Sequence, residues 1–228
     1  MSALENAPSQ PIVPLIEADL NSDDVKSSNL FGTVARNLAD KGYSVHTNGL
    51  PYVLSHMLWD EMQGLDFDQF HNAGIGRNHK TQIDTLIRSD EIMWIDATTK
   101  SRMAWLKWTA SLQDYLNEKL FLGLFSFESH FAQYKNGDFY KTHQDAFQGD
   151  DNRKISIIIY LNKNWLLKDG GELILHTNEG SGEDIKVAPE FGTLVVFLSE
   201  EMLHEVLETN CDRHSIAGWF RINKAILT

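Results

Sequence analysis

The sequence contains a single cysteine, Cys211, so no disulfide bond can form within the chain. A chain of this kind is typical of a reducing compartment, and we predict a cytoplasmic location. No apolar run approaches the roughly 20 residues that a membrane-spanning helix needs, so no membrane partner is expected. The stretch MSALENAPSQPIVPLIEADL has neither the basic region nor the apolar core of a secretory signal.

Basic residues are scarce: 20 lysines and arginines stand against 32 acidic residues, which gives a net charge of −12. Such a surface would repel phosphates, so we expect no nucleic-acid partner. The hydrophobic fraction of 42% is ordinary for a globular protein. The 228 residues fit one domain spanning 1–228. We divide it into an N-terminal arm with helical support at residues 1–65 and a β-rich core at residues 66–228.

Apolar side chains recur at helical spacing in residues 27–41 and 101–120, and residues 53–63 are typical of a shorter helix. Gly42, directly after the first segment, indicates where that helix ends. Residues 1–20 carry three of the five prolines and predict a loose arm. Helix 101–120 is expected to pack against a sheet through its apolar stripe, which consists of Trp105, Trp108, Leu112, Tyr115 and Leu120.

From Phe127 onward, short segments rich in Ile, Val, Phe and Tyr alternate with turn residues. This pattern predicts an antiparallel β-sandwich or barrel, and because helices precede strands the fold class is α+β. Further short strands are expected at GYSVH and EIMWID. The strands predicted for the core are SHFAQYK, DFYKTHQD, KISIIIYL, GELILHT, TLVVFLS, MLHEVLE and HSIAGWFRI.

His143 and Asp145 lie two residues apart in one of these predicted strands, DFYKTHQD. Side chains at this spacing point to the same face of a strand, which suits two ligands of one metal ion. The pair alone is weak evidence for a metal site, since a strand edge with polar residues facing water would have the same sequence.

His204, in the predicted strand MLHEVLE, supplies a third candidate ligand. Two histidines and one carboxylate form the ligand set of non-haem Fe(II) oxygenases and leave coordination positions open. Zinc hydrolases more often use other sets, and the sequence has no HExxH motif. A buried, hydrogen-bonded imidazole is the ordinary alternative for His204.

Arg213 follows His204 by nine residues and opens the last predicted strand. Oxygenases of this kind need a 2-oxo acid, and a permanent, planar cation is suited to grip its far carboxylate. Tyr160, in IIIYLNKNW, could donate a hydrogen bond to the same group. A surface ion pair for Arg213 and a core aromatic role for Tyr160 are the structural alternatives.

The order of these residues resembles that of the 2-oxoglutarate/Fe(II) dioxygenases of the prolyl hydroxylase type. The resemblance covers about residues 70–222 and is carried by IRSDEIMWID, QYKNGDFYKTHQD, IYLNKNW, GGELILH and LHEV. Within that group the chain looks most like the hypoxia-inducible-factor prolyl hydroxylases and their bacterial relatives that act on elongation factor Tu. The resemblance implies a double-stranded β-helix (jelly-roll) core flanked by N-terminal helices.

Carried over residue by residue, the resemblance implies roles for individual side chains. Iron would be bound by His143, Asp145 and His204. The co-substrate 2-oxoglutarate would be held by Arg213 and Tyr160, in a pocket lined by Tyr134 and Trp219. The protein substrate would be met by Arg153 at the mouth of the site and by Arg88 and Asp90 in a neighbouring loop.

Two departures from related enzymes bear on these assignments. The stretch from Tyr134 to His143 is one residue shorter than in the animal enzymes, which bears on the role of Tyr134 alone. Nucleic-acid demethylases of the same superfamily have a second arginine six residues after the anchoring one. Here that position is Trp219, which disfavours a nucleic-acid substrate.

The resemblance implies an enzyme that hydroxylates a prolyl residue of a protein, with succinate and CO2 as co-products. It would need Fe(II), 2-oxoglutarate and O2, with ascorbate as a further candidate, and elongation factor Tu or a similar protein as substrate. The segment 72–84, with Gly74 and Gly76, is a candidate lid over a bound peptide or an ordinary surface loop. The alternatives are hydroxylation of a free amino acid, a small metabolite or another protein residue, and a non-catalytic, cupin-like metal-binding module.

Overall fold

The computed structural model describes residues 15–74, 84–146, 152–177 and 183–223, and for residues 15–26, 28 and 67 it describes the backbone alone. The helices are α1 (Leu15–Lys41), α2 (Tyr52–Gly64) and α3 (Lys100–Leu120), with single 3-10 turns η1 (Phe67–Gln69) and η3 (Leu167–Asp169). The strands are β1 (Tyr43–His46), β2 (His71–Asn72), β3 (Glu91–Trp94), β4 (Leu124–Tyr134), β5 (Tyr140–His143), β6 (Arg153–Tyr160), β7 (Leu173–His176), β8 (Ile185–Val187), β9 (Leu194–Leu198), β10 (Leu203–Val206) and β11 (Arg213–Ile222).

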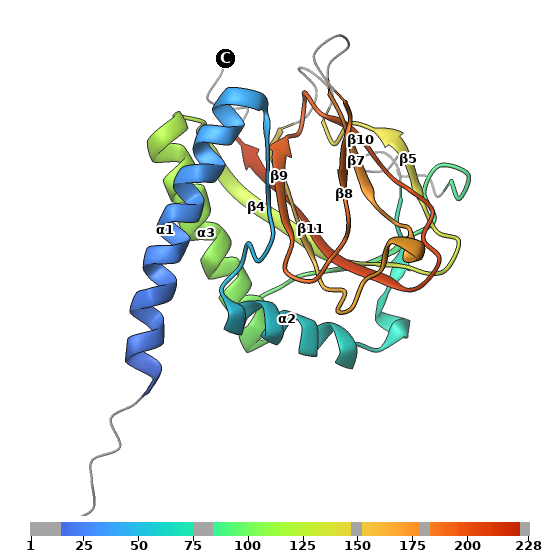
Figure 1. Cartoon of the computed structure of the whole chain (residues 1–228), viewed down its shortest axis with the longest axis horizontal. Coiled ribbons are helices and arrows are strands. Elements are labelled where there is room, and N and C mark those ends of the chain that lie inside the picture. The colour runs from blue at the N-terminus through green and yellow to red at the C-terminus, as the bar shows by residue number, and fades with distance from the viewer. Residues whose placement is uncertain (1–14, 75–83, 147–151, 178–182, 224–228) are drawn as a thin grey trace, which may run out of the picture.

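Within the described residues the strands form two antiparallel sheets. The major sheet has seven strands in the order β1-β9-β6-β11-β4-β3-β2, and the minor sheet has four in the order β5-β10-β7-β8. Helices α1 and α3 lie side by side on the face of the major sheet that points away from the minor sheet, and α2 crosses below them (Figure 1). The molecule therefore has a helical layer, a major sheet and a minor sheet.

The central strands of the major sheet are buried on both faces, as their nearly continuous apolar sequences require. In β6, Ile155, Ile157 and Ile159 belong to the core shared with the helices, whereas Tyr160 belongs to a second core between the two sheets. Alternate residues of one strand thus serve two different cores. Ser156, which faces the second side, is the buried polar residue of this strand.

The helix predictions are confirmed for 53–63 and 101–120, and α1 ends at the predicted place, before Gly42 with φ of 78°. The prediction of a loose arm at residues 1–20 is wrong for 15–20, because α1 begins at Leu15; residues 1–14 lie outside the described residues. In the described part of the chain, no helix is both long enough and apolar enough to cross a membrane.

The seven core strands are confirmed as elements, although several, among them β5, β7 and β10, are shorter than predicted. The predicted strand DFYKTHQD is only four residues long in the structure, Tyr140–His143, so Asp145 lies in the turn that follows β5. The short strands β2 and β8 were not predicted, since two and three residues carry no periodicity. The division at residue 65 stays a prediction, although α1 and α2 share one core with the major sheet.

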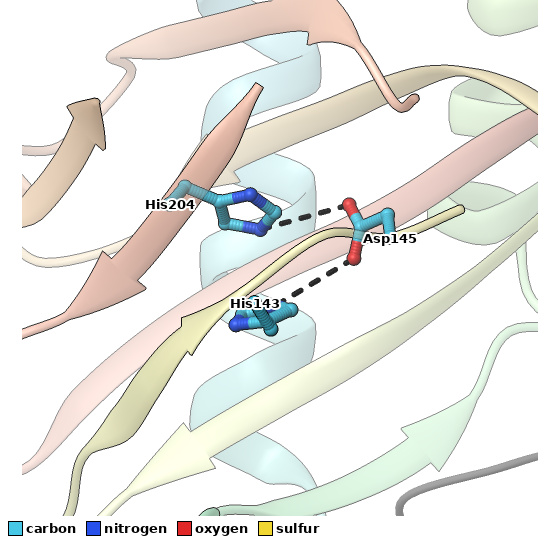
Figure 2. Close-up of side chains that lie close together, drawn as sticks. All are labelled: His143, Asp145 and His204. Atoms are coloured by element: carbon cyan, nitrogen blue, oxygen red, sulfur yellow. Dashed lines mark ion pairs between the residues drawn. The ribbon is translucent and has the colours of Figure 1, made fainter. Parts of the chain in front are cut away.

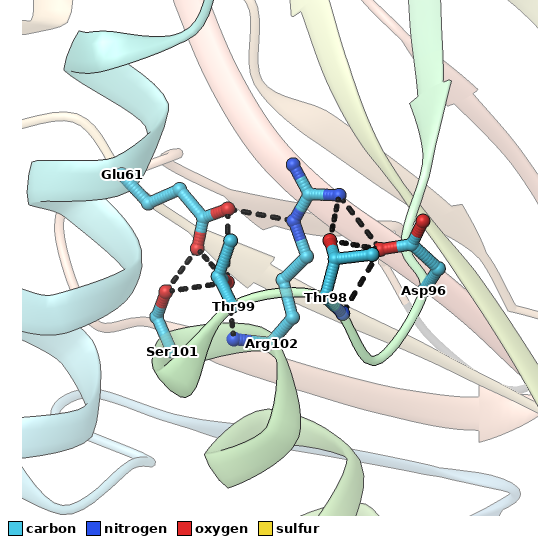
Figure 3. Close-up of polar contacts among 6 residues, drawn as sticks. All are labelled: Glu61, Asp96, Thr98, Thr99, Ser101 and Arg102. Atoms are coloured by element: carbon cyan, nitrogen blue, oxygen red, sulfur yellow. Dashed lines mark hydrogen bonds and ion pairs between the residues drawn. The ribbon is translucent and has the colours of Figure 1, made fainter.

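A polar network fastens α2 to the first turn of α3 (Figure 3). Glu61 of α2 accepts a hydrogen bond from Arg102 Nε at 2.6 Å and further ones from the hydroxyls of Thr99 and Ser101. Thr99 also caps α3 by accepting from Arg102 N at 3.2 Å. Asp96 completes the network, 2.9 Å from Arg102 Nη1.

Replacing Glu61 with glutamine is expected to destabilise the fold by about 3 kcal/mol, because it leaves a largely buried guanidinium without its main partner. In a chain of this size that loss lowers the melting temperature by about 10 °C. Asp96→Asn is the matched control: its side chain is 61% exposed against 11% for Glu61, so the melting temperature should hardly change. Equal melting temperatures for both variants would contradict the assignment.

Candidate metal centre and adjoining cavity

The three predicted metal ligands lie close together beside strands β5 and β10 of the minor sheet (Figure 2). His143 ends β5 and is paired in register with His204 of β10, and Asp145 turns back from the end of β5 to face both. Nε2 of His143 is 3.7 Å from Asp145 Oδ1, and Nε2 of His204 is 3.7 Å from Asp145 Oδ2. The ligand atoms all lie within 4.8 Å of one another. The three side chains therefore come together through the pairing of β5 with β10 and the turn after β5, and not through alternation along one strand as predicted.

Both imidazole rings are oriented by hydrogen bonds to backbone carbonyls. Nδ1 lies 2.8 Å from Lys141 O in His143 and 3.1 Å from Met202 O in His204. A carbonyl can only accept, so each Nδ1 is protonated and each neutral ring has its lone pair on Nε2, toward Asp145. Burial lowers the pKa of His204 to about 4, which keeps this ring neutral at neutral pH.

The carboxylate of Asp145 is held in its ionised form. Burial by itself would raise the pKa of Asp145, but nearby His204 and His143 and a hydrogen bond from Ser156 Oγ, at 2.6 Å, hold that pKa well below its ordinary value. Tyr140 stacks on the ring of His143, with ring centroids 3.5 Å apart. Ionised Asp145 and neutral His204 are thus in the state that metal binding requires, and the hydrogen bond of His143 Nδ1 leaves its Nε2 facing the same point.

The donor set fits a divalent metal with open coordination positions. Two neutral imidazoles and one carboxylate within the described residues leave room for exogenous ligands, whereas a structural zinc site would be closed by four protein ligands. This is the donor set and openness of non-haem Fe(II) centres.

A cavity of about 530 Å³ opens beside these three residues, between the two sheets. His143, Asp145 and His204 line it, together with Arg213. Part of its wall on the major sheet consists of small residues, which leave space between the two sheets: Ala132, Ser215, Ala217 and Gly218.

Arg213 is a buried cation in the wall of this cavity, only 2% exposed. Its Nε donates to Gly171 O at 2.8 Å, and its guanidinium lies 4.7 Å and 4.9 Å from the ring centroids of Tyr134 and Tyr160. Gly171 has φ of 65°, and a Cβ there would come within 3.0 Å of Arg213 Cδ, so a glycine is required. Within the described residues no carboxylate forms an ion pair with Arg213. A buried charge without a counter-ion calls for an anionic ligand.

The two tyrosines beside Arg213 are placed differently. Tyr134 lines the cavity, whereas Tyr160 is buried and is not one of the lining residues. The hydroxyl of Tyr160 has no hydrogen-bond partner among the described residues. Burial raises the pKa of Tyr160 against the opposing effect of Arg213, so the hydroxyl stays a potential donor. An orphaned donor next to an unpaired cation fits an anionic ligand at this end of the cavity.

Of the three residues predicted to meet substrate, Arg153 and Arg88 line the cavity and Asp90 does not. The guanidinium of Arg153 stacks 3.7 Å from the ring centroid of Trp219, and both line the cavity. Arg88 also lines it and is held by Asp90 through contacts of 2.5 and 2.9 Å. Asp90 is buried and does not line the cavity, so it positions Arg88 instead of reaching a substrate.

Sequence reasoning missed several residues of this site. His130 of β4 lines the cavity with its ring 5.3 Å from those of Trp94 and Trp219, and burial lowers its pKa to about 4. Ser156 lies against Asp145. Alternation along β4 could have indicated His130, because it shares a face with Tyr134. The predicted lid falls mostly on residues 75–83, which lie outside the described residues; Gly74 lines the cavity, and the lid stays a prediction.

Comparisons with known proteins find similarity to 2OG-Fe(II) oxygenases and prolyl hydroxylases. The sequence model described as the 2OG-Fe(II) oxygenase superfamily matches residues 129–221. The structure of a prolyl-4-hydroxylase from Pseudomonas putida is similar with a TM-score of 0.77 and 37% sequence identity, covering 85% of this chain and 99% of that one. A prolyl hydroxylase from Trichoplax adhaerens, in complex with a hypoxia inducible factor oxygen degradation domain peptide fragment, has a TM-score of 0.76 and 26% identity over 90% of this chain and 95% of that one.

Among curated relatives, Egl nine homolog 1 from Rattus norvegicus is 34% identical over 86 residues, which are 37% of this chain and 25% of that protein. The chain thus matches a quarter of the length of that relative. The structural similarities confirm the predicted α+β class with a jelly-roll core.

Proposed function

The chain belongs to the 2OG-Fe(II) oxygenase superfamily, and on that basis we propose that it hydroxylates a prolyl residue of a protein, using Fe(II), 2-oxoglutarate and O2. One observation carries the proposal: three metal donors line a single cavity together with a buried arginine that has no carboxylate partner in the part of the chain that the structure describes. Such a cavity suits a metal together with a small dicarboxylic acid.

Each part of the cavity has a task in this proposal. His143 and His204 hold iron through Nε2, and Asp145 holds it through its carboxylate. Arg213 binds the far carboxylate of 2-oxoglutarate. When bound, iron and 2-oxoglutarate supply the oxidising chemistry, in which one oxygen atom of O2 enters a prolyl C–H bond and the other enters succinate as CO2 leaves.

The chain itself binds and orients the metal and the co-substrate, and it keeps water out of the cavity. The two hydrogen-bonded imidazoles cannot turn without losing their backbone partners, so the metal positions are fixed before binding. Apolar side chains from the minor sheet, Leu173 and Val206, line the cavity and restrict the access of water. The hydroxyl of Tyr160, which has no hydrogen-bond partner among the described residues, is the candidate donor to the carboxylate that Arg213 binds.

The protein target is a proposal that rests on similarity. The relative from Trichoplax adhaerens was solved with a peptide fragment, which supports a peptidyl substrate for this chain. Arg153, Trp219 and Arg88 are suited to line the path of such a peptide. We propose elongation factor Tu as the first candidate target, since the motifs of this chain look most like those of the bacterial enzymes that act on it.

The test is direct. The chain is incubated with Fe(II), 2-oxoglutarate, O2 and ascorbate, with elongation factor Tu in one reaction and a hypoxia inducible factor degradation-domain peptide in another. Peptide mass spectrometry should find one added oxygen atom on a prolyl residue, matched by an equal amount of succinate.

Asp145→Ala is the negative control for this assay. An added oxygen on another residue type would support the alternative of a different protein hydroxylase. Consumption of 2-oxoglutarate stimulated by free amino acids, with both protein probes unmodified, would contradict a peptidyl substrate.

A further inference from the structure

The segment His143–Asp145 is fastened to the turn that leads to His204 by contacts outside the ligand set. Gln144, between the two ligands, donates from Nε2 to Glu200 O at 3.1 Å. Ser156 Oγ donates to Asp145 Oδ2 at 2.6 Å, and it lies 2.8 Å from Ser199 Oγ. None of these contacts has a place in the proposed function.

The direction of the hydroxyl chain follows from its end. An ionised carboxylate can only accept hydrogen bonds, so the hydroxyl of Ser156 donates to Asp145. Ser156 must therefore accept the hydrogen bond that it shares with Ser199. The chain therefore runs from Ser199 to Ser156 to Asp145. Ser199 is fixed in turn by its backbone N–H, which donates to Lys154 O at 3.1 Å. Both serines are at most 1% exposed, so water does not compete for these bonds.

These bonds join the two sheets where strand pairing is weakest. β5 is an edge strand of the minor sheet, and its pairing with β10 is interrupted between His204 and Val206. Ser156 belongs to β6, in the centre of the major sheet, and Ser199 directly follows β9 of the same sheet. The turn with Asp145 is thus held by the rigid centre of the fold.

We propose that Ser156, Ser199 and Gln144 are positioning residues that hold Asp145 and His143 in the metal-binding arrangement before the metal arrives. This inference rests on the metal site of the proposed function. It goes beyond that function because it assigns part of the metal affinity to three residues that are not ligands. Ser156 acts on Asp145 directly, and Ser199 acts only through Ser156.

The experiment measures Fe(II) affinity under anaerobic conditions by competition with a chelator, with neither substrate nor O2 present. Ser156→Ala is expected to bind Fe(II) about 10- to 100-fold more weakly. Ser199→Ala and Gln144→Ala should each weaken binding about severalfold. The double variant S156A/S199A should bind no more weakly than S156A, because Ser199 has no other route to Asp145. Ser156→Thr keeps the hydroxyl and should restore the affinity.

Ser129→Ala is the matched control. Ser129 is similarly buried in β4 of the same sheet, but its hydroxyl accepts from Trp105 Nε1 at 3.1 Å. This variant should lower the melting temperature and leave Fe(II) affinity unchanged. Wild-type affinity in Ser156→Ala, or an equal loss in Ser129→Ala, would overturn the proposal. A failure of prolyl hydroxylation would leave the result intact, because metal affinity is read without a substrate.

Discussion

Replacing Asp145 with alanine is expected to abolish hydroxylation and, with it, the weak visible absorption band that anaerobic Fe(II) and 2-oxoglutarate should give together in the intact chain. Turnover should fall by about a thousandfold or more, since a bound metal contributes several kcal/mol and each 1.4 kcal/mol, roughly, is a factor of ten. His143→Ala should have the same effect, because its ring faces the same point from β5. Absorption spectroscopy and succinate release measure the two losses.

The matched control is a histidine that does not line the cavity. His56 of α2 packs against Phe191, with ring centroids 5.2 Å apart. His56→Ala should keep both the absorption band and turnover. The metal assignment is wrong if Asp145→Ala and His143→Ala turn over 2-oxoglutarate as the wild type does.

Replacing Arg213 with methionine should raise KM for 2-oxoglutarate by about a hundredfold and leave Fe(II) affinity nearly unchanged. A charged contact in a buried site is worth about 2–5 kcal/mol, which spans this factor. Arg213→Lys should lose part of the affinity, because an ammonium cannot grip a carboxylate at two points. Calorimetric titration of the Fe(II)-loaded chain with 2-oxoglutarate measures both variants.

The stability of the same variants gives an independent readout. Methionine keeps much of the packing and removes a buried charge without a counter-ion, so Arg213→Met should be no less stable than the wild type when 2-oxoglutarate is absent. Added 2-oxoglutarate should raise the melting temperature of the wild type and not that of Arg213→Met. An equal rise in both would show that the acid binds elsewhere.

The elements that sequence predicted well are those with long, regular patterns. The apolar stripe of α3 reveals a helical period because one face must be buried, and the short apolar, β-branched run of β6 is typical of a strand buried on both faces. The first turns of α1 were missed because residues 15–26, LIEADLNSDDVK, have an acidic sequence that follows three prolines and shows little periodicity.

For the site, the ligand types and their order were predictable, and the geometry was not. Asp145 reaches His143 and His204 from a turn, which no alternation pattern encodes. Ser156 and Ser199 are separated by 43 positions and come from different segments, so their contact depends on the pairing of β6 with β9. Nothing in the sequence near Ser199 marks it as different from other serines.

The major sheet separates two kinds of interior. Among the described residues, 24 buried apolar side chains form the core on the helix side, whereas the core toward the minor sheet has ten and adjoins the cavity. The helix side therefore contributes most of the stability, and the side toward the minor sheet determines which ligands the cavity binds. Substitutions of cavity residues can therefore change which ligands bind, while the larger core on the helix side keeps the protein folded. This arrangement allows specificity to change with little loss of stability.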